Sequence, residues 1–202
     1  SGTFIGHAPA DAQMVGVELD TLSARVAAAL YPSAQVRNES FADTAVPDNS
    51  FVAAIGNVPF GDIKLWDDAH NRAQHSIHNH FIVKSLDLTA PGGYQIVLTS
   101  RFTMDNADPK ARREILSRAD LLGAIRLPSN AFRRVAGTAV VTDILVLRRR
   151  EADRVIEAGA DDWLHTASLT VAVDDGTDTE IDINSYFHDH PENILGSPSL
   201  GH

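Results

Sequence analysis

Residues 50–60 read SFVAAIGNVPF, and this stretch decides the expected fold. SFVAAIG is a continuous apolar run of strand length, which is typical of a strand covered on both faces in a parallel sheet. The run passes directly into Asn57, Val58, Pro59 and Phe60, so this turn follows the carboxyl end of the strand. Open α/β sheets bind their ligands at that end. We therefore expect a ligand-binding loop at residues 57–60.

The segments around this stretch alternate between strand-like and helix-like patterns. Hydrophobic spacing and capping residues predict further strands at 14–19, 35–37, 94–99, 121–127 and 139–148, and helices at 22–30, 71–88 and 108–117. A turn is expected at 90–93. Strands that alternate with helices favour an α/β fold with a doubly wound, mostly parallel sheet. After residue 150 the pattern weakens to a short helix at 155–164, a short strand at 169–173 and a turn at 174–176.

The composition is that of an ordinary globular protein. Of 202 residues, 44% are hydrophobic and 22% are charged. No run approaches the roughly 18 to 20 apolar residues that cross a bilayer, and no export signal is recognisable, so we expect a cytoplasmic protein without a membrane partner. The chain has no cysteine, which rules out disulfides and thiolate metal ligands.

Charge divides the chain into two parts near residue 150. Residues 151–202 hold one basic and 12 acidic side chains, whereas residues 1–150 hold 16 basic and 15 acidic ones. We therefore expect one domain at 1–150 and an acidic, irregular extension at 151–202. Six arginines late in the domain either form a basic face for DNA or are scattered over a solvated surface: Arg112, Arg113, Arg118, Arg126, Arg133 and Arg134.

The four residues at 57–60 have the groups needed to hold an exocyclic amine. The side-chain oxygen of Asn57 and the backbone carbonyl of Val58 can accept its two hydrogens and leave the nitrogen lone pair free. Pro59 stiffens the turn, and Phe60 can stack on the planar ring that carries the amine. By itself the sequence is also that of an ordinary turn.

The motif resembles the Asn-Pro-Pro-Tyr/Phe signature of S-adenosylmethionine-dependent amino-methyltransferases, with Val58 in place of the first proline. Residues 1–6 (SGTFIG) resemble the end of that family's glycine-rich motif. The resemblance implies a class I methyltransferase fold whose last strand is antiparallel. It also implies that S-adenosylmethionine binds at Gly2, Thr3 and Phe4, that Glu18 and Leu19 contact its ribose, and that Ser40 and Phe41 flank its adenine.

The order of the motifs resembles gamma-type N6-adenine DNA methyltransferases. Residues 126–132 and 142–147 are similar to the closing strands of restriction-system methylases, and residues 184–196 to a segment of large phage and plasmid methylase–helicase fusions. The resemblance implies DNA as the partner, with the target adenine flipped out of the duplex. It also places the family's first strand upstream, so we expect a larger polypeptide with recognition or helicase regions.

Two other functions remain open. A protein-glutamine methyltransferase uses a similar loop, and a methylase-like module can bind cofactor or DNA without catalysis. A metal site is not expected, because no carboxylate pattern completes one. The histidines at 70, 75, 78, 80, 188 and 190 are expected to be solvated. The chain has no phosphate-binding Gly-x-x-x-x-Gly-Lys motif, so it is not the helicase motor itself.

Overall fold

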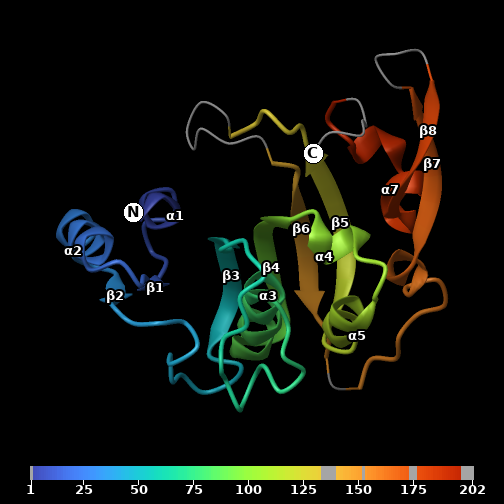
Figure 1. Cartoon of the computed structure of the whole chain (residues 1–202). Coiled ribbons are helices and arrows are strands. Elements are labelled where there is room, and N and C mark those ends of the chain that lie inside the picture. The colour runs from blue at the N-terminus through green and yellow to red at the C-terminus, as the bar shows by residue number, and fades with distance from the viewer. Residues whose placement is uncertain (1, 133–139, 152, 173–176, 197–202) are drawn as a thin grey trace.

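The computed structural model describes residues 2–132, 140–151, 153–172 and 177–196 (Figure 1). Its strands form three sheets. Strand β1 (Val15–Val17) pairs in parallel with β2 (Gln35–Arg37). A four-stranded sheet has the order β3 (Phe51–Asn57), β4 (Thr89–Ser100), β6 (Thr142–Arg149) and β5 (Ala119–Leu127). Strands β7 (Thr166–Ala172) and β8 (Asp178–Asn184) form an antiparallel hairpin.

Strand directions in the four-stranded sheet agree with the expected α/β fold. Strand β3 is parallel to β4, and β6 is antiparallel to both of its neighbours, β4 and β5. Strands β3, β4 and β5 therefore run in one direction, and their carboxyl ends lie at the same edge. The expectation of a mostly parallel sheet with an antiparallel last strand is confirmed.

Helices α3 (Ile77–Leu88) and α5 (Lys110–Leu116) cover one face of this sheet. The amide of Gln95 on β4 donates to the carbonyl of Ile82 on α3 (3.1 Å), which fixes the helix above the strand. The remaining helices are short, apart from α2: α1 (Thr3–Gly6), α2 (Thr21–Leu30), α4 (Phe102–Asp105), α7 (Ser185–Asp189) and the 3-10 turns η1 (Asp162–Leu164) and η2 (Pro191–Asn193).

Two local predictions differ from the structure for identifiable reasons. The helix expected from residue 71 begins only at Ile77, because the Asn71 side chain bonds Leu65 O (2.9 Å) and the His75 amide (2.8 Å) and folds the chain into a turn. The turn expected at 90–93 lies inside β4, where the register with β3 shifts. Gly93 is required there, since a Cβ on it would lie 2.6 Å from Val52 O.

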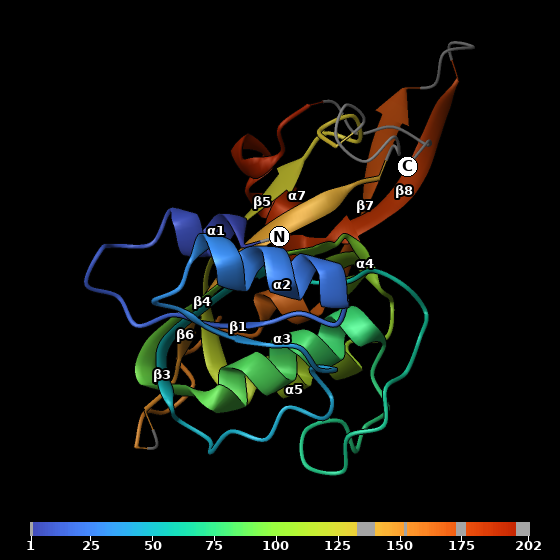
Figure 2. The same ribbon diagram turned by 90° about the vertical axis from the view of Figure 1, so that its left-hand side faces the viewer.

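We call residues 2–48 the N-terminal unit and the described residues from 49 to 196 the central unit. The main hydrophobic cluster of the structure lies in the central unit and is centred on Ile82, Leu86, Leu145 and Leu147, each fully buried. The N-terminal unit buries only two apolar side chains, Ala24 and Ala27 of α2. Figure 2 shows this unit in front of the four-stranded sheet.

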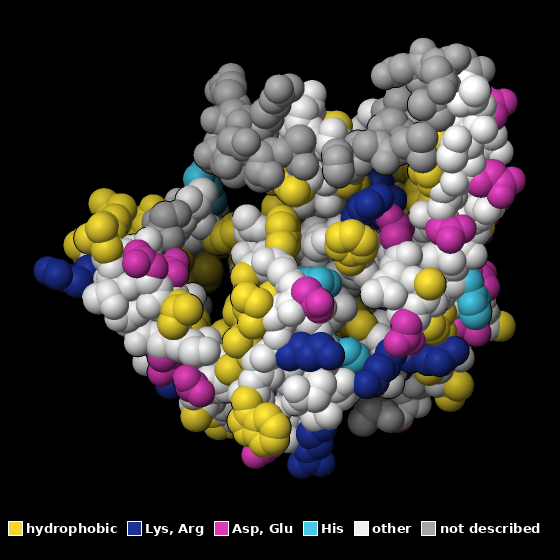
Figure 3. All heavy atoms as spheres, viewed as in Figure 1, with side chains coloured by type: hydrophobic (Ala, Val, Ile, Leu, Met, Phe, Trp, Pro, Cys, Tyr) yellow, Lys and Arg dark blue, Asp and Glu magenta, His cyan; other side chains and the backbone are white. Residues whose placement is uncertain are grey.

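The second face of the four-stranded sheet is exposed in the described part of the chain. Ile55, Ile96 and Val146 lie opposite one another across β3, β4 and β6. Ile55 is 51% exposed and Ile96 is 40% exposed. In Figure 3 the surface is hollowed between the N-terminal unit and the sheet, and hydrophobic side chains lie beside the hollow. The doubly wound arrangement thus has helices of the described residues on one face of this sheet only.

Residues beyond 150 contribute to the same core. Ile183 of β8 and Phe187 of α7 are buried in the central cluster together with Trp163. Asn184 donates to Met104 O (2.7 Å) and to Trp163 O (2.8 Å), which ties the hairpin to the sheet domain. The extension therefore contains a hairpin that the sequence analysis did not predict, whereas the helix expected at 155–164 is only the 3-10 turn η1. The predicted turn at 174–176 lies outside the described residues.

The helices of the described residues are too short, and too polar, for any of them to traverse a lipid bilayer.

Candidate functional site

The loop at 57–60 leaves the sheet at its carboxyl edge, as the sequence predicted. Asn57 is the last residue of β3 and is exposed. The Val58 amide still donates to Leu98 O (3.0 Å), and the Val58 side chain is buried, so the position after Asn57 is anchored to β4. Pro59 has no N–H to continue the ladder, and the chain turns away there. Phe60 is 40% exposed.

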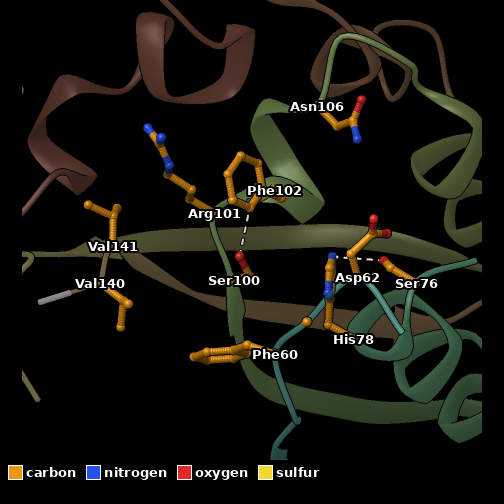
Figure 4. Close-up of a pocket in the computed structure, with 11 residues that line it drawn as sticks. Phe60, Asp62, Ser76, His78, Ser100, Arg101, Phe102, Asn106, Val140 and Val141 are labelled. Atoms are coloured by element: carbon orange, nitrogen blue, oxygen red, sulfur yellow. Dashed lines mark hydrogen bonds between the residues drawn. The ribbon is translucent and has the colours of Figure 1, made fainter. Parts of the chain in front are cut away.

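Phe60 lines a cleft of about 570 Å³ at this edge of the sheet (Figure 4). The end of β4 and the start of α4 contribute Ser100, Arg101 and Phe102 to it, and the start of α3 contributes Ser76 and His78. In Figure 4 the Phe102 ring lies above the Phe60 ring, and the His78 side chain lies to their right at a height between them. The remaining lining residues are Gly61, Asp62, Asn106, Val140 and Val141.

Polar groups in the cleft are mostly neutral. The ring of His78 is 6% exposed, and its Nε2 lies 3.0 Å from Ser76 Oγ. Burial lowers the pKa of His78, although the Gly61 backbone and the Asp62 carboxylate act in the opposite direction, so the ring is neutral at pH 7. The Arg101 guanidinium stacks over the Phe102 ring at 5.1 Å. Two aromatic faces with mostly neutral polar groups, and with the charges of Arg101 and Asp62 opposed, are suited to a planar, uncharged ring.

The predicted ribose-binding residues lie at the carboxyl end of β1. Glu18 follows β1, and its Oε1 accepts a hydrogen bond from the Asp20 amide (3.1 Å). Asn38 after β2 donates to Glu18 O (2.9 Å) and Leu19 O (3.0 Å), which fixes the backbone at this point. The Leu19 side chain is 72% exposed. Asn38 was not among the predicted site residues, although its place just after a strand could have indicated it.

Gly2 adopts φ 79° and precedes the short helix α1, which contains Thr3 and Phe4. A Cβ on Gly2 would lie 2.7 Å from the Tyr31 ring, so both the backbone angle and the space require glycine. Phe4 is 44% exposed. The glycine therefore allows a close approach of α1 to the end of α2, while the predicted contact with a cofactor is untested.

Ser40 and Phe41 belong to a tight turn after β2. Thr44 Oγ1 donates to Ser40 O (3.2 Å), and the Ala42 amide donates to Ser40 Oγ (3.3 Å). The Phe41 ring packs on Phe81 of α3 with 4.7 Å between ring centroids, and Lys84 Nζ lies 5.2 Å from the Phe41 ring centroid. The predicted adenine-flanking segment is thus held against α3.

A buried polar cluster under this turn was missed by the sequence analysis. Lys84 Nζ donates to Asp67 Oδ2 (2.9 Å) and Ala42 O (3.0 Å), and His80 Nε2 lies 3.0 Å from Asp67 Oδ2. Burial alone would raise the pKa of Asp67, but the hydrogen bonds from Lys84, His80 and the His70 amide hold it well below its usual range. No motif or spacing marks these residues, because they are 13 to 17 positions apart.

The expectation that the histidines are solvated is wrong for three of them. His75, His78 and His80 are buried and not solvated, and His75 Nε2 lies 2.7 Å from Glu114. No group of histidines and carboxylates within the described ranges could hold a metal ion.

Two of the six arginines fit neither a basic face nor a solvated surface, because they are buried. Arg112 is buried and donates to Leu164 O (2.7 and 3.1 Å), and Arg126 forms buried ion pairs with Asp143 and Asp105 (2.8 and 2.9 Å). Arg118 pairs with Asp87 (2.7 Å). Arg133 and Arg134 lie outside the described residues.

The structure groups the predicted site residues into two sets. Gly2, Glu18 and Leu19 belong to the N-terminal unit, whereas Asn57 and Phe60 belong to the central unit (Figure 1). Phe41, which also lies in the N-terminal unit, contacts Phe81 and Lys84 of the central unit. Glu18 and Leu19 follow β1, Ser40 and Phe41 follow β2, and Asn57 ends β3, whereas Gly2, Thr3 and Phe4 precede β1.

Similar proteins and solved structures identify the fold of this chain. No protein-family model matches the chain. It is 32% identical over 158 residues to defense against restriction protein B of Escherichia phage P1, a match that spans 76% of this chain and 7% of that relative. The chain therefore covers a small part of the curated relative that it matches.

Three solved structures that share the fold are described as a methyltransferase or as modification proteins of type I restriction enzymes. A class I S-adenosylmethionine-dependent methyltransferase described from Listeria monocytogenes superposes with a TM-score of 0.60 at 21% identity, over 73% of this chain and 48% of that one. A type I restriction modification subunit described from Vibrio vulnificus gives 0.57 at 14%, over 84% and 46%. The M protein of EcoKI gives 0.53 at 17%, over 69% and 31%. The chain has the Rossmann-like fold of class I methyltransferases.

Proposed function

We propose that this chain is the catalytic domain of an S-adenosylmethionine-dependent methyltransferase that modifies the N6 amine of adenine in DNA. The observation that carries the proposal is the position of Asn57 and Phe60: Asn57 ends β3 at the carboxyl edge of the sheet, and Phe60, three residues later, lines a cleft large enough for a nucleobase. The methyltransferase fold and the restriction-related proteins that share it support the same reaction class.

Residues of the N-terminal unit fit the cofactor. The Glu18 carboxylate at the end of β1 is only partly buried, and a carboxylate at this place in a Rossmann-like unit accepts ribose hydroxyls. In this proposal Gly2, Thr3 and Phe4 hold the amino-acid end, Glu18 and Leu19 hold the ribose, and Ser40 and Phe41 flank the adenine. When bound, S-adenosylmethionine supplies a methyl group on a positively charged sulfur.

The central unit then holds the acceptor. Asn57 Oδ1 and the Val58 carbonyl accept the two hydrogens of the N6 amine, which leaves the nitrogen lone pair free for the methyl group. The Val58 amide donates to Leu98 O at 3.0 Å and the Val58 side chain is buried, so this position is anchored to β4 although valine replaces proline here. Phe60 stacks on the flipped adenine, as enzymes that modify a base take it out of the duplex.

Tritiated methyl transfer to unmethylated DNA tests the proposal. Wild type is expected to label DNA, and Asn57→Ala to lower the rate about 100-fold or more, as when one preorganised hydrogen-bonding group is removed from an active site. Gln35→Ala, an exposed amide at the start of β2, is the matched control and should retain full activity. Label on DNA that survives Asn57→Ala would reject the role of Asn57.

The same assay distinguishes the two other functions. Label on glutamine-containing peptides but not on DNA would identify a protein-glutamine methyltransferase. Calorimetric binding of S-adenosylmethionine without transfer to either substrate would identify a non-catalytic module.

We also propose that the chain acts within a larger polypeptide, in which one more strand lies between β1 and β3. The parallel pairs β1–β2 and β3–β4 are not joined by any ladder within the described residues, and Val52 on β3 is 83% exposed. Thermal unfolding of this chain, with and without the segment that precedes it in its gene, tests this. A midpoint that does not rise with the longer chain would contradict the added strand.

A further inference from the structure

A second cleft adjoins the one lined by Phe60. It has a volume of about 380 Å³ and shares four lining residues with the first cleft: Asp62, Ser76, Phe102 and Asn106. Phe102 is 53% exposed and therefore presents an aromatic face between the two clefts. The two clefts form one continuous depression along the carboxyl edge of β3 and β4, and Figure 4 shows its Phe102 wall.

One buried amide in the lining is incompletely paired. Asn79, in the first turn of α3, is 7% exposed and lines the second cleft. Its Nδ2 donates to Ser76 Oγ (3.2 Å), which leaves one amide hydrogen, and its Oδ1 has no hydrogen-bond partner within the ranges that the structure describes. A buried amide oxygen without a partner is costly, and such atoms are commonly satisfied by a ligand or water.

The charges around the second cleft indicate what it binds. The lining contains two basic residues, Lys64 and Lys110, and two acidic residues, Asp62 and Asp108. Lys110 Nζ also donates a hydrogen bond to Ala73 O (2.7 Å). Because the acidic and basic side chains of this lining oppose one another, the cleft has no excess of positive charge that would select an isolated phosphate. Donors, acceptors and one aromatic face together are suited to an uncharged nucleobase, whose π-face stacks and whose edge forms hydrogen bonds.

We propose that the second cleft holds the nucleobase adjacent to the target adenine, stacked on Phe102, with the Asn79 amide recognising its edge. The inference rests on the proposed function, because the adenine in the first cleft is what brings its neighbour here. A side-chain amide pairs with adenine through one donor and one acceptor, so wild type is expected to favour adenine at this position.

Equilibrium binding tests this without requiring methyl transfer. The probes are fluorescent single-stranded oligonucleotides with one target adenine and each of the four bases on either side, titrated with the natural full-length protein. Wild type should bind the adenine neighbour at least about fivefold more tightly than cytosine at one of the two flanking positions.

Asn79→Asp keeps the shape of the side chain and replaces its donor with an acceptor. The preference at that position should therefore shift from adenine towards cytosine, whose N4 amine donates. Phe102→Leu should weaken binding to all contexts by about fivefold or more, since it removes a stacking face but no base-specific group. Gln35→Glu makes the same amide-to-acid change on exposed β2 and should alter neither.

A neighbour preference that Asn79→Asp leaves unchanged would overturn the inference, and so would a wild type with no neighbour preference. Tritiated methyl transfer to the same oligonucleotides separates this failure from that of the proposed function. Methylation that is indifferent to the neighbour rejects the second cleft alone. Neither binding nor methylation of any oligonucleotide rejects both.

Discussion

The N-terminal unit and the central unit hold the two halves of the proposed site, and they are built differently. The central unit encloses a cluster of fully buried aliphatic side chains and buried ion pairs, such as Arg126 with Asp143. The N-terminal unit has a short parallel pair of strands, and Leu22, Val26 and Leu30 of α2 are all exposed. This difference indicates that the proposed acceptor site lies in the more stable unit. The N-terminal unit, which holds the proposed cofactor site, depends for its stability on contacts with other parts of the protein.

The largest effect is expected where the acidic extension enters the core. Phe187 is fully buried and stacks against the Arg126 guanidinium at 4.3 Å. Phe187→Ala should therefore lower the free energy of unfolding by about 3–5 kcal/mol. Guanidinium denaturation followed by tryptophan fluorescence measures this. A loss below about 1 kcal/mol would show that residues 151–196 are dispensable to the central unit.

The second largest effect is expected on acidification, which should lower the free energy of unfolding of the central unit. Burial lowers the pKa of His80, with Asp67 acting in the opposite direction. The unfolded chain takes up a proton at His80 below about pH 6.5 while the folded chain does not, so the unfolding free energy falls as pH drops from there. The lowered pKa of Asp67 adds a further loss below about pH 4.

The control for this prediction is a variant without a titratable side chain at position 80. Denaturation midpoints at pH 7.5 and 5.5 should differ less in His80→Gln than in wild type, even though the variant starts lower. Asp143 acts in the opposite sense, because burial raises its pKa to about 6 and the stability it contributes is lost as pH rises through that value. Equal pH dependence in both proteins would show that His80 is not the group that titrates.

A smaller, local effect is expected at the start of the N-terminal unit. Gly2→Ala places a side chain at φ 79° and against the Tyr31 ring, which should lower the local stability of α1 by about 1 kcal/mol. Hydrogen exchange at the Gly6 amide, which donates to Gly2 O (3.0 Å), reports this opening. Gly56→Ala meets no atom within 4 Å and should leave that exchange rate unchanged.

The smallest effect is expected on the outer face of α2. Leu22 is 69% exposed, so Leu22→Ala should change the unfolding free energy by less than about 0.5 kcal/mol. This is the counterpart of Phe187→Ala, since both changes remove a large apolar side chain. If Leu22→Ala lowered the unfolding free energy of this chain by 2 kcal/mol or more, the Leu22 side chain would be buried, and the two units would not differ in their apolar packing.

The sequence predicted the parts of the fold that depend on local patterns. Asp20 accepts the Ser23 amide (2.8 Å) at the start of α2, and β3 ends at Asn57 as its apolar run indicated. Strand β8 was missed although Thr179, Ile181 and Ile183 alternate with polar residues, which is the pattern of a half-buried strand; the structure pairs it with β7. Strand pairing depends on a distant partner and leaves little trace in a short segment.

The site was predictable in part, for the same reason. Asn57 and Phe60 follow a strong strand signal, and the same reasoning applied to the next parallel strand would have found Arg101 and Phe102 after β4. Asn79 and the Lys84–Asp67–His80 cluster had no such signal, since burial and pairing between distant residues determine their roles. The arginines misled for a related reason: a count of charges does not distinguish an exposed guanidinium from the buried Arg112.

The edge of β3 has a consequence for how this chain behaves in concentrated solution. In the described part of the chain β3 ends the four-stranded sheet, and Val52 and Ile55 are exposed on it. An uncovered apolar edge strand is a template on which further strands add, from another copy of the same chain as readily as from a natural partner. Self-association should therefore begin at this edge, and a lysine at position 52 would act as a gatekeeper against aggregation.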